Sequence, residues 1–215
     1  DARAIVERWR VDLPPAARRV LERGAAETVK PDDPRLAGAE TRLIASPALA
    51  LAAAVARARA LGLAALSLGD RIEGEAREVA KVLAGIALAC RDGGGPVTAP
   101  AVILSGGETA VTLGAGPVGR GGRNVEFQLS LALSLAGTAG IHALAADTDG
   151  VDGAAEVAGA FVDPTTLPRA RALGLDAAAA LAGHDAHTFF AALGDAFVTG
   201  PTDTNVNDFR AILLT

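Results

Sequence analysis

The chain has 215 residues, half of them hydrophobic, and a formal net charge of −5 at pH 7. This length and composition suit one good-sized domain with a large buried core, or one domain and part of another. The negative charge and the 3% aromatic content argue against a nucleic-acid partner, which requires a basic face or stacking platforms. No apolar run approaches the ~20 residues that cross a bilayer, so no membrane partner is expected.

The first 37 residues are expected to be the helical tail of a preceding, absent amino-terminal domain. Two short helices are predicted, residues 1–9 and 15–27, because a pair of prolines breaks the pattern between them. A proline-rich linker follows. The chain begins at Asp1 and contains no methionine, which favours a piece of a longer protein. Residues 38–215 are expected to form an α/β domain.

The next segment has the pattern of strand, helix, strand and helix. Residues 41–45 and 63–68 are predicted to be parallel strands. The helix between them is expected to begin at Ser46, a favourable N-cap, and to end at Gly62. A second helix is predicted from about Glu73 to Arg91, since the acidic residues at its start match the helix dipole.

The single cysteine of the chain, Cys90, lies in the second of these helices. It excludes an intrachain disulfide and fits a protein of the reducing cytoplasm. Because its surroundings are rich in alanine and leucine, we expect a buried, inert thiol.

The most informative stretch runs from Ser105 to Asn124. An apolar run, then Ser-Gly-Gly-Glu-Thr at 105–109, then a second apolar run at 110–113 predict a strand, a tight turn and another strand. A glycine-rich loop, residues 114–122, leads into a helix predicted at 125–135.

This glycine-rich loop has the composition of an anion site. The N-terminus of a helix offers unpaired N–H groups and the positive end of the helix dipole. Arg120 and Arg123 add planar donors that match phosphate or carboxylate. The alternative is a mobile loop with two solvated arginines. Arg123-Asn124 stands where a P-loop has Gly-Lys-Ser/Thr, so a P-loop is excluded.

Two polar blocks follow in the second half of the chain. Asp147-Thr-Asp149-Gly-Val-Asp152 comes directly after a strand predicted at 141–145. Ligands and metals bind at the carboxyl ends of strands in open α/β sheets, and carboxylates suit Mg²⁺. The alternative is an acidic turn or a helix cap. The Thr-, Asn- and Asp-rich residues 199–208 precede an apolar strand at 209–214, and they either cradle a polar ligand or bond locally in turns.

The region between these two blocks is less specific. Helices are predicted at 165–173 and 177–181, and Asp185 is expected to cap a further helix. His184 and His187 are interpreted as polar groups of the surface or of a rim, since no third ligand completes a zinc site.

Five blocks of sequence, taken in order, resemble the second half of the class II glycerate 2-kinases, including their carboxy-terminal MOFRL domain. They are residues 73–79, 105–109, 119–126, 148–153 and 199–208. The resemblance covers most of the chain. It implies an α/β fold with a layered, mixed and largely parallel sheet and helices on both faces. It also implies transfer of the γ-phosphoryl group of ATP to the 2-hydroxyl of D-glycerate, with Mg²⁺, in a cleft between two domains.

The same resemblance assigns roles to residues of this chain. Arg123 and Asp149 are the expected catalytic residues, with Arg123 on the substrate carboxylate or the transferred phosphate. Asp149 and Asp152 are the expected metal ligands. The residues expected to bind substrate or phosphate are Gly106, Gly107, Glu108, Thr109, Arg120, Gly121, Gly122, Asn124, Glu126, Thr202, Asn205 and Asn207.

The chain also departs from the family pattern. Asp147 and His184 stand where Gly and Asn are more usual. The Gly-Lys-Ala motif of the family's amino-terminal half does not occur, so we expect the isolated chain to be inactive without the missing amino-terminal domain of the same protein.

Two alternative functions stay open at this point. One is a hydroxypyruvate reductase, which the lack of a Gly-x-Gly-x-x-Gly sequence after a strand disfavours. The other is a non-catalytic, ligand-binding half-domain. The oligomeric state is open as well, with a homodimer among the options.

Overall fold

The computed structural model describes residues 1–24, 27–154 and 156–215, and it divides into two compact units, Asp1–Leu43 and Ile44–Thr215. The first unit holds α1 (Ala2–Trp9), α2 (Pro15–Arg23) and a short 3₁₀ helix, η1 (Pro34–Leu36). Both predicted helices are present. The second ends before residue 27 because Gly24 adopts a left-handed conformation with φ of 62°. Residues 25 and 26 of that prediction lie outside the described residues.

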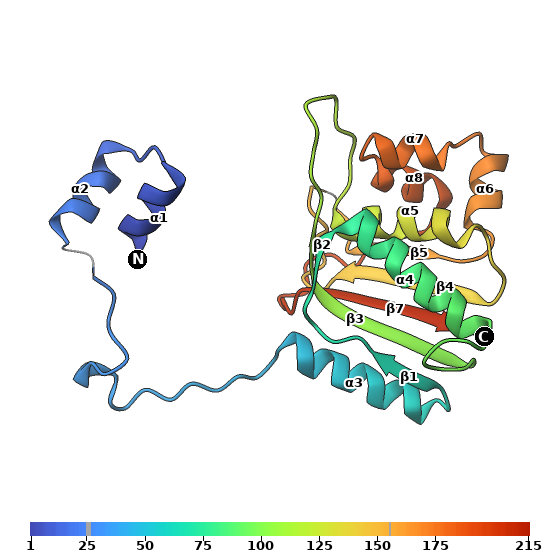
Figure 1. Ribbon diagram of the computed structural model, residues 1–215, viewed down its shortest axis with the longest axis horizontal. Coiled ribbons are helices and arrows are strands. Elements are labelled where there is room, and N and C mark those ends of the chain that lie inside the picture. Colours follow the sequence, from blue (N-terminus) through green and yellow to red (C-terminus); the bar gives the residue numbers. More distant parts are fainter. Residues whose placement is uncertain (25–26, 155) are drawn as a thin grey trace. The chain divides into compact units, whose positions relative to one another are not determined.

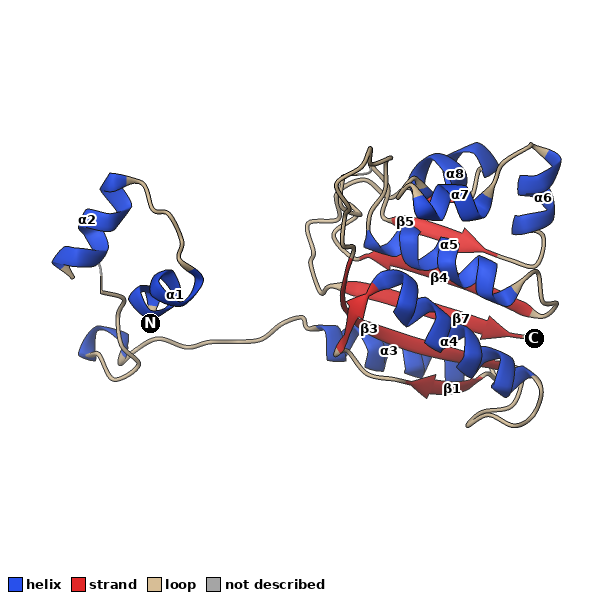
Figure 2. Ribbon diagram, turned by 45° about the horizontal axis from the view of Figure 1, so that its top comes forward, coloured by secondary structure: helices blue, strands red, loops and turns tan. Residues whose placement is uncertain are grey.

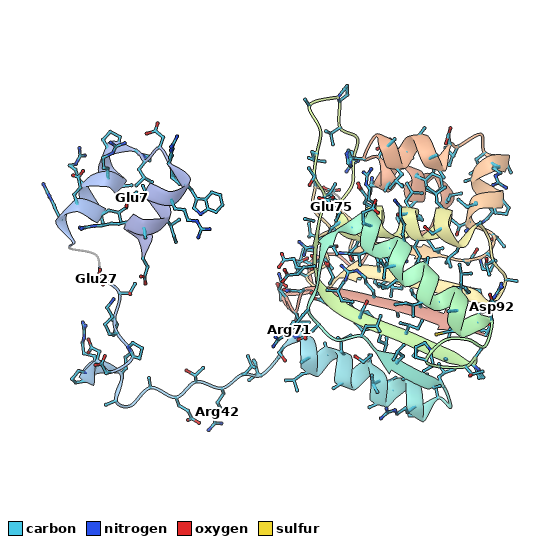
Figure 3. The ribbon with its side chains drawn as sticks, viewed as in Figure 1. Glu7, Glu27, Arg42, Arg71, Glu75 and Asp92 are labelled. Carbon is cyan, nitrogen blue, oxygen red and sulfur yellow. The ribbon has the colours of Figure 1, made fainter. Side chains whose placement is uncertain are left out.

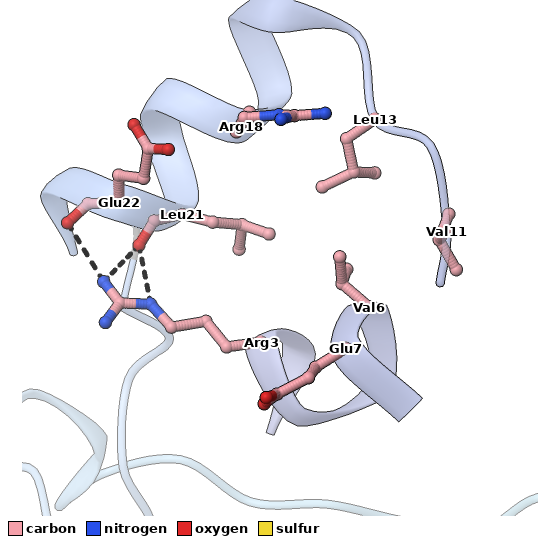
Figure 4. Close-up of a pocket in the computed structure, with 8 residues that line it drawn as sticks. All are labelled: Arg3, Val6, Glu7, Val11, Leu13, Arg18, Leu21 and Glu22. Atoms are coloured by element: carbon pink, nitrogen blue, oxygen red, sulfur yellow. Dashed lines mark hydrogen bonds between the residues drawn. The ribbon is translucent and has the colours of Figure 1, made fainter. Parts of the chain in front are cut away.

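A hollow of about 490 Å³ lies between α1 and α2 (Figure 4). Arg3 closes one side of it by donating from Nε to the carbonyl oxygen of Leu21 over 2.9 Å. None of the predicted site residues lines this hollow.

The second unit begins with α3 (Pro47–Ala60), and the Ser46 side chain accepts a hydrogen bond from the N–H of Leu49 as predicted. The strand predicted at 41–45 is wrong, because these residues form no strand and Ile44 is 91% exposed. Strand β1 (Ala64–Ser67) pairs with a later strand instead. The short run Leu43-Ile44-Ala45 pairs with no strand and is exposed to solvent, so it forms a loop.

One mixed sheet forms the middle of the second unit (Figures 1 and 2). Its order is β1-β3-β7-β4-β5-β6, and β2 also pairs with β3. The mixed sheet is confirmed, but it is not largely parallel: β3 is parallel to β1 and β2, and all other pairings are antiparallel. The strands are β2 (Ile72–Glu75), β3 (Ala101–Ala110), β4 (Ile141–Asp147), β5 (Gly159–Val162), β6 (Ala196–Phe197) and β7 (Asp208–Leu214).

Helices cover both faces of the sheet, as predicted. On one face α3 packs on Val102 and Leu104 of β3. On the other face α4 (Ala76–Arg91) and α5 (Arg123–Leu135) pack on Ala101 and Ile103, because successive side chains of a strand point to opposite faces. Three short helices, α6 (Thr166–Ala172), α7 (Ala177–Ala182) and α8 (Ala186–Leu193), pack against α5. Cys90 is buried, as expected.

Helix α4 begins three residues later than predicted. Residues 72–75 form β2, and Gly74 has a φ of 110° that no helix contains. Glu75 is therefore not part of an acidic helix start. Its carboxylate accepts from the N–H and the hydroxyl of Thr112 and so fastens the base of the loop that follows β3 (Figure 3). No helix within the described ranges is long and apolar enough to cross a membrane.

The predicted strand–turn–strand at 101–113 is also wrong. Residues 101–110 form one continuous strand, and Gly106 and Gly107 lie inside it. Their small size serves close approach, because a Cβ atom on Gly107 would lie 2.1 Å from the carbonyl oxygen of Ile72 in β2. Residues 111–122 then form a long loop that projects beyond the sheet and returns to α5 (Figure 1).

Replacing Gly107 with Ala is expected to lower the free energy of unfolding by about 1–3 kcal/mol, because φ is +130° and the added methyl group meets β2 backbone. Gly85→Ala is the matched control, since Gly85 lies in α4 with nothing within 4 Å of an added Cβ atom. The control should gain roughly 0.5–1 kcal/mol. Urea unfolding of both variants measures the difference, and equal stabilities would contradict this account of Gly107.

Candidate active site

The ends of β3, β4 and β7 meet at the N-terminus of α5. Asp208, the first residue of β7, pairs in register with Gly107 of β3 on one side and with Asp147 of β4 on the other. Arg123 begins α5 beside them. Residues that are far apart in the sequence are thereby brought to one edge of the sheet.

A pocket of about 550 Å³ opens at this edge. Its wall combines one arginine and two acidic side chains with apolar side chains from the end of β3 and from the long loop. The lining residues are Glu108, Thr109, Ala110, Val111, Leu113, Val118, Gly119, Gly121, Gly122, Arg123, Glu126, Gly153, Ala154 and His184.

Arg123 is held by three carboxylates. Its Nε donates to Asp208 over 2.8 Å, its Nη2 to Asp147 over 2.5 Å and its Nη1 to Glu108 over 3.2 Å. Partial burial opposes the charged form, but the three carboxylates outweigh it and raise the pKa of Arg123. The side chain is therefore a fixed, permanently charged group, and it is 26% exposed.

Asp208 is the buried centre of this arrangement. Besides Arg123, its carboxylate accepts from Asn124 Nδ2 over 2.8 Å, from the N–H of Thr109 over 3.2 Å and from Arg210. Arg210 is fully buried beneath Phe127, with its guanidinium carbon 5.1 Å from the ring centroid. Burial lowers the pKa of Arg210, and Asp208 opposes that effect. The positive charge of Arg210 and the negative charge of Asp208 therefore stabilise each other inside the protein.

The N-terminus of α5 already holds an anion, and that anion is Asp152. Its fully buried carboxylate accepts from the N–H of Asn124 over 3.0 Å and of Val125 over 2.8 Å. A Cβ atom on Gly122 would lie 2.1 Å from the carbonyl oxygen of Asp152, so the glycine permits this contact. Burial raises the pKa of Asp152 to about 6, against the hydrogen bonds that lower it. The expected free anion site at this helix end is therefore filled from within the chain.

The remaining predicted residues gather in a second group, at the loops that follow β4 and precede β7. Asp149 accepts from the N–H of Val151 over 2.9 Å and from Asn205 Nδ2 over 3.3 Å. The Thr202 hydroxyl donates to the carbonyl oxygen of Thr148, and the N–H of Asn207 donates to Asn205 Oδ1. This group does not line the 550 Å³ pocket. It adjoins the Arg123 cluster through Asp147, whose Oδ1 accepts from the N–H of Asp149.

Glu126 lines the pocket but is already paired. Its 4%-exposed carboxylate accepts from Arg77 Nε over 2.9 Å and lies 2.9 Å from Nδ1 of His184. The same Nδ1 also lies 3.0 Å from Nη2 of Arg77, so the three side chains of Arg77, Glu126 and His184 meet at one point. Glu126 therefore holds the α4, α5 and 181–185 segments together at the pocket wall.

The glycine-rich loop is anchored rather than free. Asp185 stands at the N-cap position of α8, but its carboxylate accepts from the N–H of Arg120 over 2.9 Å. The N–H of Gly119 donates to the carbonyl oxygen of Gly183. The guanidinium of Arg120 is exposed and has no hydrogen-bond partner among the described residues. His187 also lies near Arg120, and burial, followed by that charge, lowers its pKa.

The structure thus brings six of the predicted residues to one pocket. They are Glu108, Thr109, Gly121, Gly122, Arg123 and Glu126. Gly106 and Gly107 pack inside β3, Asn124 is buried below the pocket, and Arg120 lies on the exposed loop. Sequence reasoning assigned no role to Asp208, Arg210 or Arg77, although Asp208 and Arg77 lie in the blocks 199–208 and 73–79. Aspartate is depleted in strands, so its presence at position 208, at the start of an apolar strand, was the available signal of a special role.

The residues present do not form a magnesium site by themselves. Asp152 is buried and bonded to α5, and both oxygens of Asp149 accept hydrogen bonds. Within the described parts of the chain, no three His, Cys, Asp or Glu side chains are grouped so as to hold a metal ion. No chemical step below is therefore routed through a metal.

Fold and site together define an α/β domain whose candidate site is centred on one arginine at the ends of its strands. The model of the MOFRL family matches residues 101–208, half of the chain, and the chain belongs to this family. The resemblance to glycerate kinases is thereby confirmed.

Three relatives set the scale of the similarity. A glycerate 2-kinase of Pyrococcus horikoshii is 34% identical over 221 residues, covering 100% of this chain and 49% of its own. A protein of Agrobacterium vitis, with the provisional name hydroxypyruvate reductase, is 58% identical over 214 residues. The match covers 100% of this chain and 48% of that protein. The crystal structure of glycerate kinase from Thermotoga maritima matches with a TM-score of 0.85 at 31% identity, covering 100% and 50%. The chain spans about half the length of these relatives.

Proposed function

We propose that this chain supplies the arginine-bearing half of a glycerate 2-kinase, which phosphorylates D-glycerate to 2-phosphoglycerate with ATP. The similarity to glycerate kinases over the whole chain supports the reaction class. The observation that carries the proposal is Arg123, a fixed cation in the wall of a pocket large enough for a small ligand. Phosphoryl transfer depends chiefly on positioning and on neutralising negative charge, which such a group provides.

In this proposal each residue has a limited task. Arg123 donates from Nη1 to an anionic oxygen of the substrate or of the transferred phosphate. Asp147 and Asp208 fix the guanidinium plane, and Leu113 and Val118 line the same pocket. Bound ATP supplies the γ-phosphoryl group. Asp149 and the 199–208 loop are proposed to meet the ligand from the adjoining edge.

The rest of the catalytic machinery is proposed to lie in an amino-terminal half of the same protein. Residues 1–37 are then the end of that half, and residues 38–215 are the MOFRL-type domain. The chain covers about half the length of its relatives, which supports a further half in the same protein. We propose a cytoplasmic enzyme that uses ATP with Mg²⁺ and whose isolated 215-residue part lacks kinase activity.

Calorimetric titration with Mg-ATP and with D-glycerate tests the role of Arg123. Arg123→Lys keeps a charge beside Asp208 but removes Nη1, so binding should weaken about 10- to 100-fold, the value of one hydrogen bond to a charged group. Arg57→Ala is the control, since Arg57 is exposed on α3 and lies outside the pocket, and it should bind within about twofold of wild type. Equal binding by wild type and Arg123→Lys would contradict the proposal.

The second candidate function is reduction of hydroxypyruvate, which the provisional name of the Agrobacterium vitis relative favours. A dinucleotide normally places its pyrophosphate at a helix N-terminus that follows a glycine-rich turn. Here Asp152 occupies that position on α5. We therefore expect no hydroxypyruvate-dependent oxidation of NADH or NADPH, and sustained oxidation would favour the reductase over the kinase.

A further inference from the structure

Of the three nitrogens in the Arg123 guanidinium, Nη1 is the one bonded to a solvent-exposed carboxylate. Nε and Nη2 are bonded to Asp208 and Asp147, whose side chains are 0% and 4% exposed. Nη1 is bonded to Glu108, whose side chain is 59% exposed. A ligand in the pocket can therefore approach Arg123 at Nη1, where a carboxylate of the chain itself is already bound.

The contact between Glu108 and Arg123 is the weakest of the three. It is the longest, at 3.2 Å against 2.5 and 2.8 Å, and the only one whose acidic partner is open to solvent. Exposed ion pairs contribute little, because water and salt screen them. Asp147 and Asp208 are buried, so leaving Arg123 would remove a counter-charge that water cannot replace there. Glu108 is therefore the carboxylate that an incoming anion can replace at Arg123.

A second carboxylate, that of Glu73, lies beside Glu108 on the neighbouring strand. Glu73 of β2 pairs in register with Glu108 of β3, so the two side chains lie next to each other on one face of the sheet. Glu73 is exposed and has no ion-pair partner among the described residues. Like charges at paired positions repel, so Glu73 opposes a close approach of the Glu108 carboxylate to β2.

We propose that Glu108 is an internal competitor for anions: it occupies Nη1 of Arg123 in the free protein, and an anionic ligand binds by displacing it. Glu108 then sets how strongly Arg123 discriminates against weak anions. This role differs from the direct ligand contact that the sequence predicts for Glu108. It rests on the proposed function only for the choice of D-glycerate as the second probe.

The two roles predict opposite results for Glu108→Gln. If Glu108 competes, removing its charge frees Nη1, and every anion gains by the same factor, because each is spared the same displacement. If Glu108 instead contacts the hydroxyl groups of the substrate, the variant loses affinity for D-glycerate and leaves inorganic phosphate unchanged. Inorganic phosphate carries no carbon skeleton, so it reports on Arg123 alone.

The experiment is calorimetric titration of inorganic phosphate and D-glycerate into wild type, Glu108→Gln and Glu73→Gln at low ionic strength. Glu73→Gln removes the same charge from the adjacent strand without touching Arg123, so it controls for general electrostatics. Glu108→Gln should bind both anions about three- to fivefold tighter than wild type, the range expected for releasing one exposed ion pair. Glu73→Gln should change either affinity by less than about twofold.

Several results would overturn the proposal. They are unchanged or weaker phosphate binding by Glu108→Gln, an equal gain in Glu73→Gln, and a failure of Glu108→Gln to bind phosphate at all. A gain for phosphate without any binding of D-glycerate supports the competitor and removes support for the glycerate kinase. Glu108→Ala, at the same exposed position, should repeat the gain of Glu108→Gln, and circular dichroism should show all variants folded.

Discussion

Replacing Asp208 with Asn is expected to lower the free energy of unfolding by about 3–5 kcal/mol, the cost of breaking a buried ion pair by removing one partner. The side chain is fully buried and faces two arginines, Arg123 and Arg210. Arg210 has no other acidic partner among the described side chains, so the substitution leaves a buried charge uncompensated. Urea unfolding followed by circular dichroism measures the change.

Two comparisons make this prediction specific. Asp203→Asn lies in the same polar loop but is exposed, with a φ of 56° that Asn tolerates, so it should stay within about 0.5 kcal/mol of wild type. Adding Arg210→Met to Asp208→Asn removes the stranded charge and should recover part of the loss. A mild effect of Asp208→Asn, within the range of the Asp203 control, would contradict the role of Asp208 as the centre of the cluster.

Asp152→Asn should abolish a pH dependence of stability that the wild type has. Burial raises the pKa of Asp152 from 3.8 to about 6 in the folded chain, so the folded state holds the proton more tightly than the unfolded state. Its contribution is fully present below pH 3.8 and is lost as the pH rises through about 6. The stability of wild type relative to Asp152→Asn should therefore fall by about 3 kcal/mol between pH 4 and pH 7.

The measurement is urea unfolding of both proteins across this pH range, since asparagine does not titrate and all other groups are shared. Asp176→Asn offers a control, because Asp176 also accepts from the first N–H groups of a helix, α7, but lies at the surface. Its difference from wild type should not fall as the pH rises from 4 to 7. A difference between wild type and Asp152→Asn that is flat, or that grows with pH, would contradict the buried, raised carboxyl group.

Local signals in the sequence carried much of the fold. Ser46-Pro47 predicts the start of α3, and the glycine-rich loop predicts the start of α5, because caps and turns depend on neighbouring residues. The wrong predictions came from sequence patterns that fit two different structures. Gly106 and Gly107 were interpreted as a turn, whereas they permit close approach of β2 and β7 to a straight strand. Residues 41–45 include Leu43 and Ile44, which favour a strand, but the segment pairs with no other strand.

The site was predictable in its residues but not in its pairings. Arg123 was found from the composition of its loop, while its partner Asp208 lies 85 positions away in the sequence. The helix end that suits an anion was also recognised, but the anion is Asp152, 28 positions beyond Asn124. Only the three-dimensional arrangement shows that a favourable anion position is already filled, because pairing over such separations follows from topology rather than from local pattern.

The order of the strands bears on how the chain acquires its shape during synthesis. Strand β7, residues 208–214, lies between β3 and β4 and carries both Asp208 and Arg210. Before β7 is in place, β3 and β4 each have an unpaired edge and Arg123 lacks Asp208, one of its two buried counter-charges. Long-range pairings of this kind form slowly. The edges of β3 and β4 that face β7 therefore stay open until β7 is inserted, and this part of the site is completed together with the sheet.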